Sequence, residues 1–237
     1  MNQKTAVLLP GNMCDARVWP AAVHAAFGRM NLVDADLTAD TTIAAMAARI
    51  LADVSGPLLP VGFSMGGIVA LEMARQAPAR VVGLVLADTN AGADRPERAA
   101  VRPAQQARVR AGELATIVAD ELKPNYLAAT SRDDAALKTL LFDMAIGLGA
   151  EVFCRQSEAL RTRVDNTAVL DEFGGPVLLL VGAEDALCPP AWHEAMAARC
   201  ARATLRIIAG AGHMLPLEQP QAFAAATGAW LDEETIA

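Results

Sequence analysis

The sequence predicts an α/β protein: a mostly parallel central sheet flanked by helices, with a helical insertion. Near both ends of the chain, short apolar runs alternate with helix-like segments, the pattern of a parallel sheet covered on two faces. Between residues 90 and 173 a stretch rich in Ala and Arg breaks this rhythm. Hydrophobic residues make up 54% of the 237 residues, which is enough for a sizeable core.

Six apolar runs predict the strands. Each is short, aliphatic or β-branched in character, and bounded by Gly, Pro or polar residues. The pattern is weak for the second run and clear for the others. The six expected strands are residues 5–9, 32–37, 58–63, 81–87, 177–181 and 205–208.

Helices are expected between and after these strands, at residues 19–30, 42–54, 65–76, 191–200 and 216–231. Thr41 or Asp40 is a plausible N-cap for the second of them. The stretch 90–173 contains two segments of helical periodicity, 111–122 and 133–146. A continued α/β alternation would instead place a strand every few tens of residues. We therefore predict a core of residues 1–89 and 174–237 and a helical lid of residues 90–173.

Charge and composition exclude several classes of protein. The formal net charge of −7 disfavours binding to a phosphate backbone, so no nucleic-acid partner is expected. The N-terminal apolar run ends at Pro10 and is too short to span a bilayer, which favours the cytoplasm. The four cysteines form no C-x-x-C pair and are expected to be reduced. His24, His193 and His213 lack zinc-site spacings, so no metal is expected.

The segment Gly62-Phe63-Ser64-Met65-Gly66-Gly67 carries the strongest chemical signal. It lies between a predicted strand and a predicted helix, where a G-x-S-x-G turn presents a nucleophile. Gly62 and Gly66 lack the Cβ atoms that would clash in a strained turn around Ser64. A phosphate-binding loop is the rival use of such a turn, but the pattern G-x-x-x-x-G-K-[S/T] is absent. Ser64 is therefore the candidate nucleophile.

An anionic tetrahedral intermediate needs two fixed N–H donors. Met65 supplies one by its position directly after Ser64. The second is expected from the loop after the first strand, where Gly11 permits a sharp bend. Asn12 or Met13 would present its backbone N–H there, and Asn12 is preferred.

A carboxylate and an imidazole follow the last two predicted strands. Asp185 comes after the strand 177–181, and Asp88, after 81–87, is the second candidate. His213 lies in a loop of small residues after the strand 205–208. In this assignment His213 is the general base for Ser64, and Asp185, preferred over Asp88, orients the imidazole.

The chain resembles α/β-hydrolase-fold enzymes in P-G-N-M-C-D, G-F-S-M-G-G, V-G-A-E-D-A-L-C-P-P and G-A-G-H-M-L-P-L-E-Q-P, which span nearly all of it outside the insertion. The order Ser, Asp, His is the one expected of this fold. The resemblance implies a helical lid between the fourth and fifth strands. The chain departs from it in two ways. Pro10 replaces a usual His, and the N-terminal strand pair is lacking, which leaves about six strands.

The resemblance implies hydrolysis of a carboxylic ester through an acyl-enzyme, without a cofactor. The partner would be a small-molecule ester or lactone in a mainly apolar pocket lined by Met13, Leu187 and Met214. An enol-lactonase, a C–C bond hydrolase, a triad-using lyase and a non-catalytic ligand-binding protein are the alternatives. Eight arginines could bind a carboxylate or form a solvated helix face: Arg95, Arg98, Arg102, Arg108, Arg110, Arg155, Arg161 and Arg163.

Overall fold

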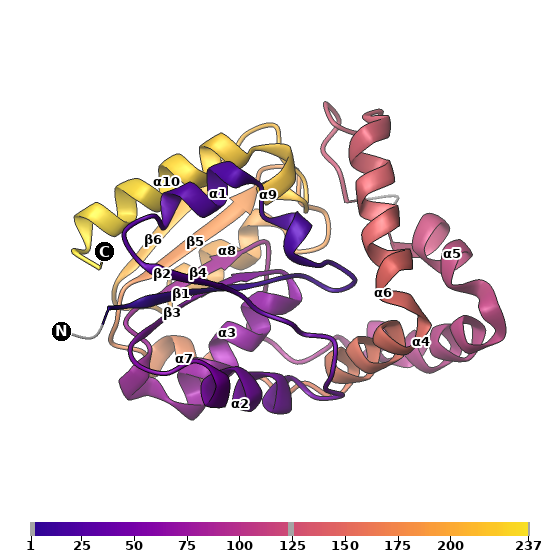
Figure 1. The fold of residues 1–237 in the computed structure, drawn as a ribbon, viewed down its shortest axis with the longest axis horizontal. Helices are drawn as coiled ribbons and strands as arrows, with labels where there is room; N and C mark the ends of the chain where they lie inside the picture. Colours follow the sequence, from indigo (N-terminus) through magenta and orange to yellow (C-terminus); the bar gives the residue numbers. More distant parts are fainter. Residues whose placement is uncertain (1–2, 123–125, 237) are drawn as a thin grey trace.

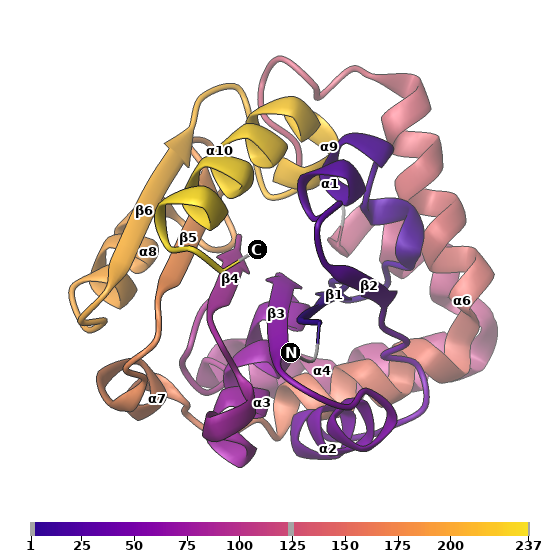
Figure 2. The same ribbon diagram turned by 60° about the vertical axis from the view of Figure 1, so that its left-hand side comes forward.

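The computed structural model describes residues 3–122 and 126–236, and contains one six-stranded sheet in which every pair of neighbours is parallel. The strand order is β2-β1-β3-β4-β5-β6 (Figures 1 and 2). The predicted α/β class with six strands is confirmed. The strands are β1 (Thr5–Leu9), β2 (Asn31–Asp34), β3 (Leu58–Phe63), β4 (Leu84–Ala87), β5 (Val177–Gly182) and β6 (Ala203–Ile208).

Helices cover both faces of the sheet. One face packs against α1 (Ala21–Ala26) and α10 (Pro220–Glu233), and the other against α2 (Ile43–Asp53), α3 (Met65–Gln76) and α8 (Pro190–Ala197) (Figure 1). Alternation along β1 divides the core between the two layers. Ala6 and Leu8 belong to the cluster under α10, whereas Val7 and Leu9 belong to the cluster under α3. Burial on both faces explains why the strands read as continuous apolar runs.

Two local predictions are corrected by the structure. The helix expected over residues 19–30 is α1, which is limited to Ala21–Ala26. The N-cap of α2 is Thr42, whose hydroxyl oxygen accepts from the Ala45 N–H at 3.1 Å, and not Thr41 or Asp40. Asp40 instead pairs with Arg49 at 2.8 Å.

Helices also fill the stretch between β4 and β5, beyond the carboxyl ends of the strands (Figure 1). The longest is α6, which runs well past residue 146 and changes direction at Gly149, where φ is 82°. Residues 123–125 of the predicted lid lie outside the described residues. The short helix α7 packs against α3, and the division into core and lid stays a prediction. The helices are α4 (Pro96–Arg108), η3 (Val109–Glu113), α5 (Leu114–Thr116), η4 (Ile117–Leu122), α6 (Ala135–Arg161) and α7 (Thr167–Glu172).

The strand order creates a crevice at the carboxyl edge of the sheet. From β1 the chain passes outward to β2 and then returns to β3 on the other side of β1. Loops that leave β1 and β3 therefore diverge, and ligands of open α/β sheets bind at such a switch point. The loop after β1 and the turn after β3 are the two segments in which the N–H donors and the nucleophile are predicted. Within the described residues, none of the helices combines the length and apolar character needed to cross a bilayer.

Candidate active site

Ser64 lies on a strained turn between β3 and α3. Its backbone angles are φ 51° and ψ −115°, in a region that residues other than Gly rarely adopt. Two glycines make the turn fit. A Cβ atom at Gly62 would lie 2.4 Å from the carbonyl oxygen of Gly66, and one at Gly66 would lie 1.9 Å from that of Leu9. The turn places the Ser64 hydroxyl at the N-terminal end of α3, above the crevice between β1 and β3.

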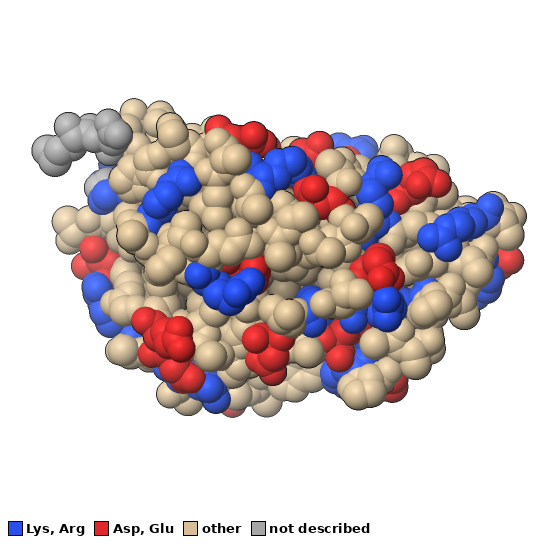
Figure 3. Space-filling model, turned by 90° about the horizontal axis from the view of Figure 1, so that it is seen from below, with Lys and Arg blue, Asp and Glu red and all other residues tan. Residues whose placement is uncertain are grey.

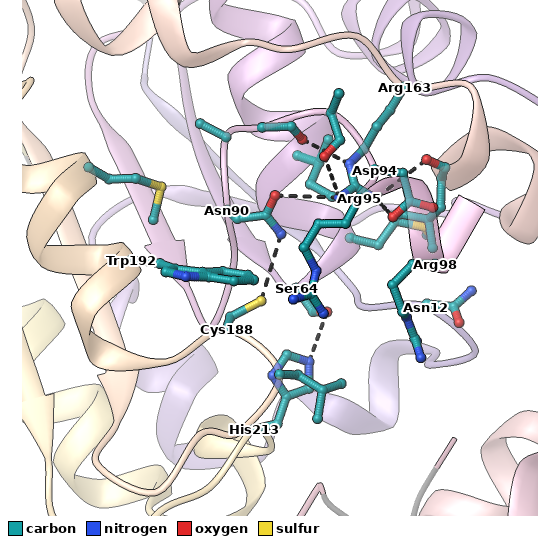
Figure 4. A pocket seen from close by; sticks show the side chains of 18 of the residues that line it. Asn12, Ser64, Asn90, Asp94, Arg95, Arg98, Arg163, Cys188, Trp192 and His213 are labelled. Carbon is teal, nitrogen blue, oxygen red and sulfur yellow. Dashed lines mark hydrogen bonds and ion pairs between the residues drawn. The ribbon is translucent and has the colours of Figure 1, made fainter. Parts of the chain in front are cut away.

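Ser64, His213 and Asp185 form a continuous chain of hydrogen bonds. His213 Nε2 lies 3.0 Å from Ser64 Oγ (Figure 4), and His213 Nδ1 lies 2.8 Å from Asp185 Oδ2. The imidazole ring is held between the rings of Phe63 and Tyr126, with centroid distances of 5.5 and 5.3 Å. The structure thus brings together the three side chains predicted as nucleophile, base and acid, from three separate loops.

The surroundings of Asp185 keep it ionised. Its Oδ1 accepts hydrogen bonds from the N–H groups of Leu187 at 2.8 Å and Cys188 at 3.0 Å. Burial acts to raise the pKa of this carboxyl, but the His213 imidazole and these N–H groups outweigh it and hold the pKa below its ordinary value. A carboxylate in this state favours an imidazolium beside it.

Asp88, the second candidate acid, occupies a different environment. Its Oδ1 accepts from the Gly182 N–H at 2.9 Å and is not bonded to the imidazole. Complete burial, together with the negative charge of nearby Asp185, raises its pKa well above the ordinary value. Burial and the charge of Asp185 therefore favour the protonated form of Asp88, in contrast to the lowered pKa of Asp185.

Gln156 of α6 fastens the loop that follows β1. Its Oε1 accepts from the Met13 N–H at 2.8 Å and from the Asn12 side chain at 3.1 Å, and its Nε2 donates to the Leu37 carbonyl at 3.1 Å. The Met13 N–H is therefore already engaged. Across residues 3–122 and 126–236, the backbone N–H groups of Asn12 and Met65 have no hydrogen-bond partner.

Two glutamates attach residues 126–129 to the catalytic loops. Glu218 accepts from the Gly212 and Ala128 N–H groups, each at 2.8 Å, through its two carboxylate oxygens. Glu184 accepts from the Ala129 N–H at 2.8 Å. The backbone N–H of His213 donates to the backbone carbonyl of Tyr126 at 2.7 Å. Residues 126–129 therefore help to fix the position of the His213 loop.

The pocket has a volume of about 720 Å³ and lies between these loops and the helices that join β4 to β5 (Figure 4). Ser64 and His213 line it, as do Asn12, Met65 and Leu187. It is therefore continuous with the reactive hydroxyl and with the two unpaired N–H groups.

The pocket differs from the prediction at two positions. Leu187 lines it as expected, but Met13 and Met214 do not. Both methionines are fully buried. Met13 packs with Val109 and Phe153 in a cluster beneath α6, and Met214 lies in the core cluster on the α10 side of the sheet. Sequence adjacency to a catalytic loop placed them near the site without indicating which way their side chains point.

Asp185, Cys188 and His213 offer ligand atoms within 4.8 Å of one another, the one potential metal-binding group found in the described part of the chain. The imidazole and the carboxylate are already bonded to each other. Burial raises the pKa of the Cys188 thiol, and metal binding would require a thiolate. The chemistry of these three groups therefore does not fit a metal site, and His213 and Asp185 belong to the hydrogen-bond chain with Ser64.

A family model described as the alpha/beta hydrolase family matches residues 6–226. The chain belongs to the alpha/beta hydrolase family. This hydrolase is 32% identical over 199 residues to a pimeloyl-[acyl-carrier protein] methyl ester esterase of Neisseria meningitidis serogroup B, covering 81% of this chain and 76% of the relative. An esterase of the same name from Aromatoleum aromaticum is 30% identical over 193 residues, with 76% of each chain covered. At family level the chain is a carboxylic ester hydrolase of the alpha/beta hydrolase type.

Solved structures agree with this assignment. A thermophilic esterase from Thermogutta terrifontis, with malate bound, superposes with a TM-score of 0.87 at 27% identity, covering 98% of this hydrolase and 90% of that chain. The enol-lactonase from Burkholderia xenovorans LB400 superposes with a TM-score of 0.83 at 19% identity, covering 98% and 92%. The second likeness shows a shared fold alone.

Gln156, Glu218 and Tyr126 shape the site of this hydrolase, although the sequence analysis did not single them out. Gln156 lies in the middle of a helix, and the sequence alone does not distinguish it from a solvent-exposed polar residue. Glu218 lies five residues after His213, within the segment G-A-G-H-M-L-P-L-E-Q-P, and this spacing was the available signal for a carboxylate that braces the loop. Tyr126 adjoins residues 123–125 in a segment without periodicity.

Proposed function

We propose that this hydrolase cleaves carboxylic esters through an acyl-enzyme on Ser64, with His213 as general base and acid and Asp185 as the orienting carboxylate. The observation that carries the proposal is the unbroken hydrogen-bond chain from Ser64 Oγ through both imidazole nitrogens to Asp185 Oδ2. A serine hydroxyl is a weak nucleophile unless a base accepts its proton, and this arrangement supplies the base.

In the first half-reaction, Ser64 Oγ attacks the ester carbonyl and transfers its proton to His213 Nε2. The resulting oxyanion accepts hydrogen bonds from the N–H groups of Asn12 and Met65. Cleavage of the acyl C–O bond releases the alcohol, which takes the proton from His213. Water then attacks the acyl-enzyme with His213 again as base, and the acid and free Ser64 are regenerated.

The engagement of Met13 supports Asn12 as the second oxyanion donor. The Met13 N–H is donated to Gln156 and cannot also point at an intermediate. Asn12 lines the pocket, as does Met65, and the N–H of each is unpaired among the described residues. These are the two donors expected from the loop after β1 and from the start of α3.

The relatives favour a methyl ester as the bond that is cleaved. The names of the Neisseria meningitidis and Aromatoleum aromaticum proteins describe hydrolysis of a methyl ester. In this chain, Met65, Ile68 and Leu187 provide apolar surface in the same pocket as Ser64. We therefore propose that a small methyl or other short-chain alkyl ester with a partly apolar acyl chain is the substrate, in preference to a lactone or a C–C bond.

Turnover of p-nitrophenyl butyrate and of aliphatic methyl esters tests this proposal. The wild-type enzyme should hydrolyse both, and Ser64→Ala should lower kcat by at least about 10³-fold while the circular dichroism spectrum is retained. Comparable turnover in a folded Ser64→Ala variant would refute the assignment of the nucleophile. Cleavage of lactones or β-diketones in place of esters would refute the reaction class.

A further inference from the structure

Positive charge is concentrated at the pocket of an otherwise acidic protein. The chain carries a formal net charge of −7, yet five arginines and only two carboxylates line the pocket among the described residues. On the outer face seen in Figure 3, charges of both signs are intermixed. An excess of cationic side chains around a cavity focuses an attractive potential on anionic ligands.

Most of these arginines already have partners. Arg102 Nε lies 2.6 Å from Asp94 Oδ2, and Arg163 Nη1 lies 2.9 Å from Asp94 Oδ1, so two cations share one carboxylate. Arg163 is nearly buried and also donates to the Gly92 carbonyl at 3.0 Å. Arg199 pairs with Asp171, outside the pocket lining. Together, Asp94, Arg102 and Arg163 therefore carry one net positive charge.

Arg98 is the arginine of the pocket that lacks a partner within residues 3–122 and 126–236. It forms no ion pair and no hydrogen bond there. Arg98 lies on α4 four residues before Arg102, so these two side chains share one side of the helix, and Arg95 is the N-cap residue that precedes α4. Arg95 lies over the Trp192 ring at 5.4 Å, and Figure 4 shows Arg95 and Arg98 directed into the pocket.

We propose that Arg98 binds a carboxylate on the acyl portion of the substrate, so that the preferred substrate is the half-ester of an aliphatic dicarboxylic acid. This inference rests on the proposed ester hydrolysis at Ser64. A guanidinium group presents a planar pair of N–H donors that matches a carboxylate, and no described residue accepts from the donors of Arg98. The nearby charge of Arg102 adds attraction for an anion.

The rest of the lining suits such a substrate. Ile68, Leu160 and Leu187 line the same pocket as Ser64 and Arg98 and provide apolar surface for a methylene chain. One end of the chain then carries the ester at Ser64 and the other end carries the carboxylate at Arg98. A neutral ester of equal length would leave the guanidinium group without its ligand.

Monomethyl adipate and methyl hexanoate form a matched pair, because they share the acyl chain length and differ in the terminal carboxylate. The wild-type enzyme should show the larger kcat/KM for monomethyl adipate. Arg98→Met should lower the ratio of the two kcat/KM values by about tenfold or more, mainly through the KM of the half-ester. Arg98→Lys should retain part of the ratio. Arg110→Met, on an exposed residue outside the pocket, should leave the ratio unchanged.

A binding measurement separates this inference from the proposed function. Calorimetric titration of Ser64→Ala should show tighter binding of monomethyl adipate than of methyl hexanoate, and Ser64→Ala combined with Arg98→Met should abolish the difference. A wild-type preference for methyl hexanoate, or a ratio unaffected by Arg98→Met, would overturn the carboxylate site while leaving ester hydrolysis intact. Failure to hydrolyse either ester, with the binding preference retained, would overturn the proposed function alone.

Discussion

Replacement of Gln156 by Met tests how α6 controls the loop after β1. The variant keeps the size of the side chain but removes the acceptor for the Met13 N–H and the donor to the Leu37 carbonyl. Each of these two buried backbone groups left without a partner costs about 1–3 kcal/mol, so the free energy of unfolding should fall by roughly 2–6 kcal/mol. Domains in the middle and upper part of the ordinary stability range of about 5–15 kcal/mol remain folded after such a loss, and urea unfolding shows whether the variant does.

The same replacement should affect catalysis through Asn12. Loss of one oxyanion donor typically lowers kcat about 10²–10³-fold. Gln156→Met leaves the Asn12 N–H in the chain but releases the loop that aims it, so we expect kcat to fall about 10- to 100-fold with little change in KM. Gln105→Met is the matched control, because Gln105 also makes a side-chain hydrogen bond but lies outside the pocket lining.

Steady-state kinetics on p-nitrophenyl butyrate, together with urea unfolding of each variant, gives both quantities. An unfolding free energy that falls while kcat stays at the wild-type value would show that Gln156 supports only the fold. A rise in KM with unchanged kcat would place its effect on substrate binding and would also contradict the reasoning.

Three other substitutions test the surroundings of the triad. Above about pH 4 the Asp88 carboxyl of the unfolded wild-type chain loses its proton, whereas the folded protein, in which the pKa of Asp88 is raised, retains it. The wild type therefore loses stability as pH rises, and Asp88→Asn, which has no such proton, should become increasingly more stable than the wild type. Urea unfolding at several pH values measures this gain. Burial lowers the pKa of His193 from 6.5 to about 4, so on acidification this imidazole is protonated in the unfolded chain before it is protonated in the folded protein. The free energy of unfolding should therefore fall by roughly 3 kcal/mol between pH 6.5 and about pH 4. His193→Gln should flatten this dependence in the same urea series. Gly212→Ala should lower kcat for p-nitrophenyl butyrate at least about tenfold, because the added Cβ would lie 2.7 Å from the Tyr126 carbonyl oxygen and displace the loop of His213.

The strands and the meeting of Ser64, His213 and Asp185 were predictable because their signals are local. Continuous apolar runs, such as Val177–Gly182, follow from burial of both sheet faces, and the spacing of Gly62 and Gly66 around Ser64 follows from the steric demands of one turn. Each residue of the proposed triad follows one of these predicted strands along the chain. All of these features can be read within a few consecutive residues.

Features that depend on packing between distant segments could not be predicted. Gln156 meets Met13 across 143 residues, and no local pattern distinguishes it from a solvated helix residue. The arginines of α4 show the same limit. Their sequence permits either a solvated face or a ligand-binding face, and only the path of the chain between β4 and β5 turns Arg95, Arg98 and Arg102 toward the pocket.

Covalent labelling with a fluorophosphonate, followed by intact-protein and peptide mass spectrometry, tests the nucleophile and its base most directly. The hydrogen-bond chain predicts a single adduct on Ser64, no adduct in Ser64→Ala, and labelling at least about 100-fold slower in His213→Ala, because the hydroxyl then lacks its proton acceptor. An adduct on another residue, or labelling at the wild-type rate in a folded His213→Ala variant, would contradict the account.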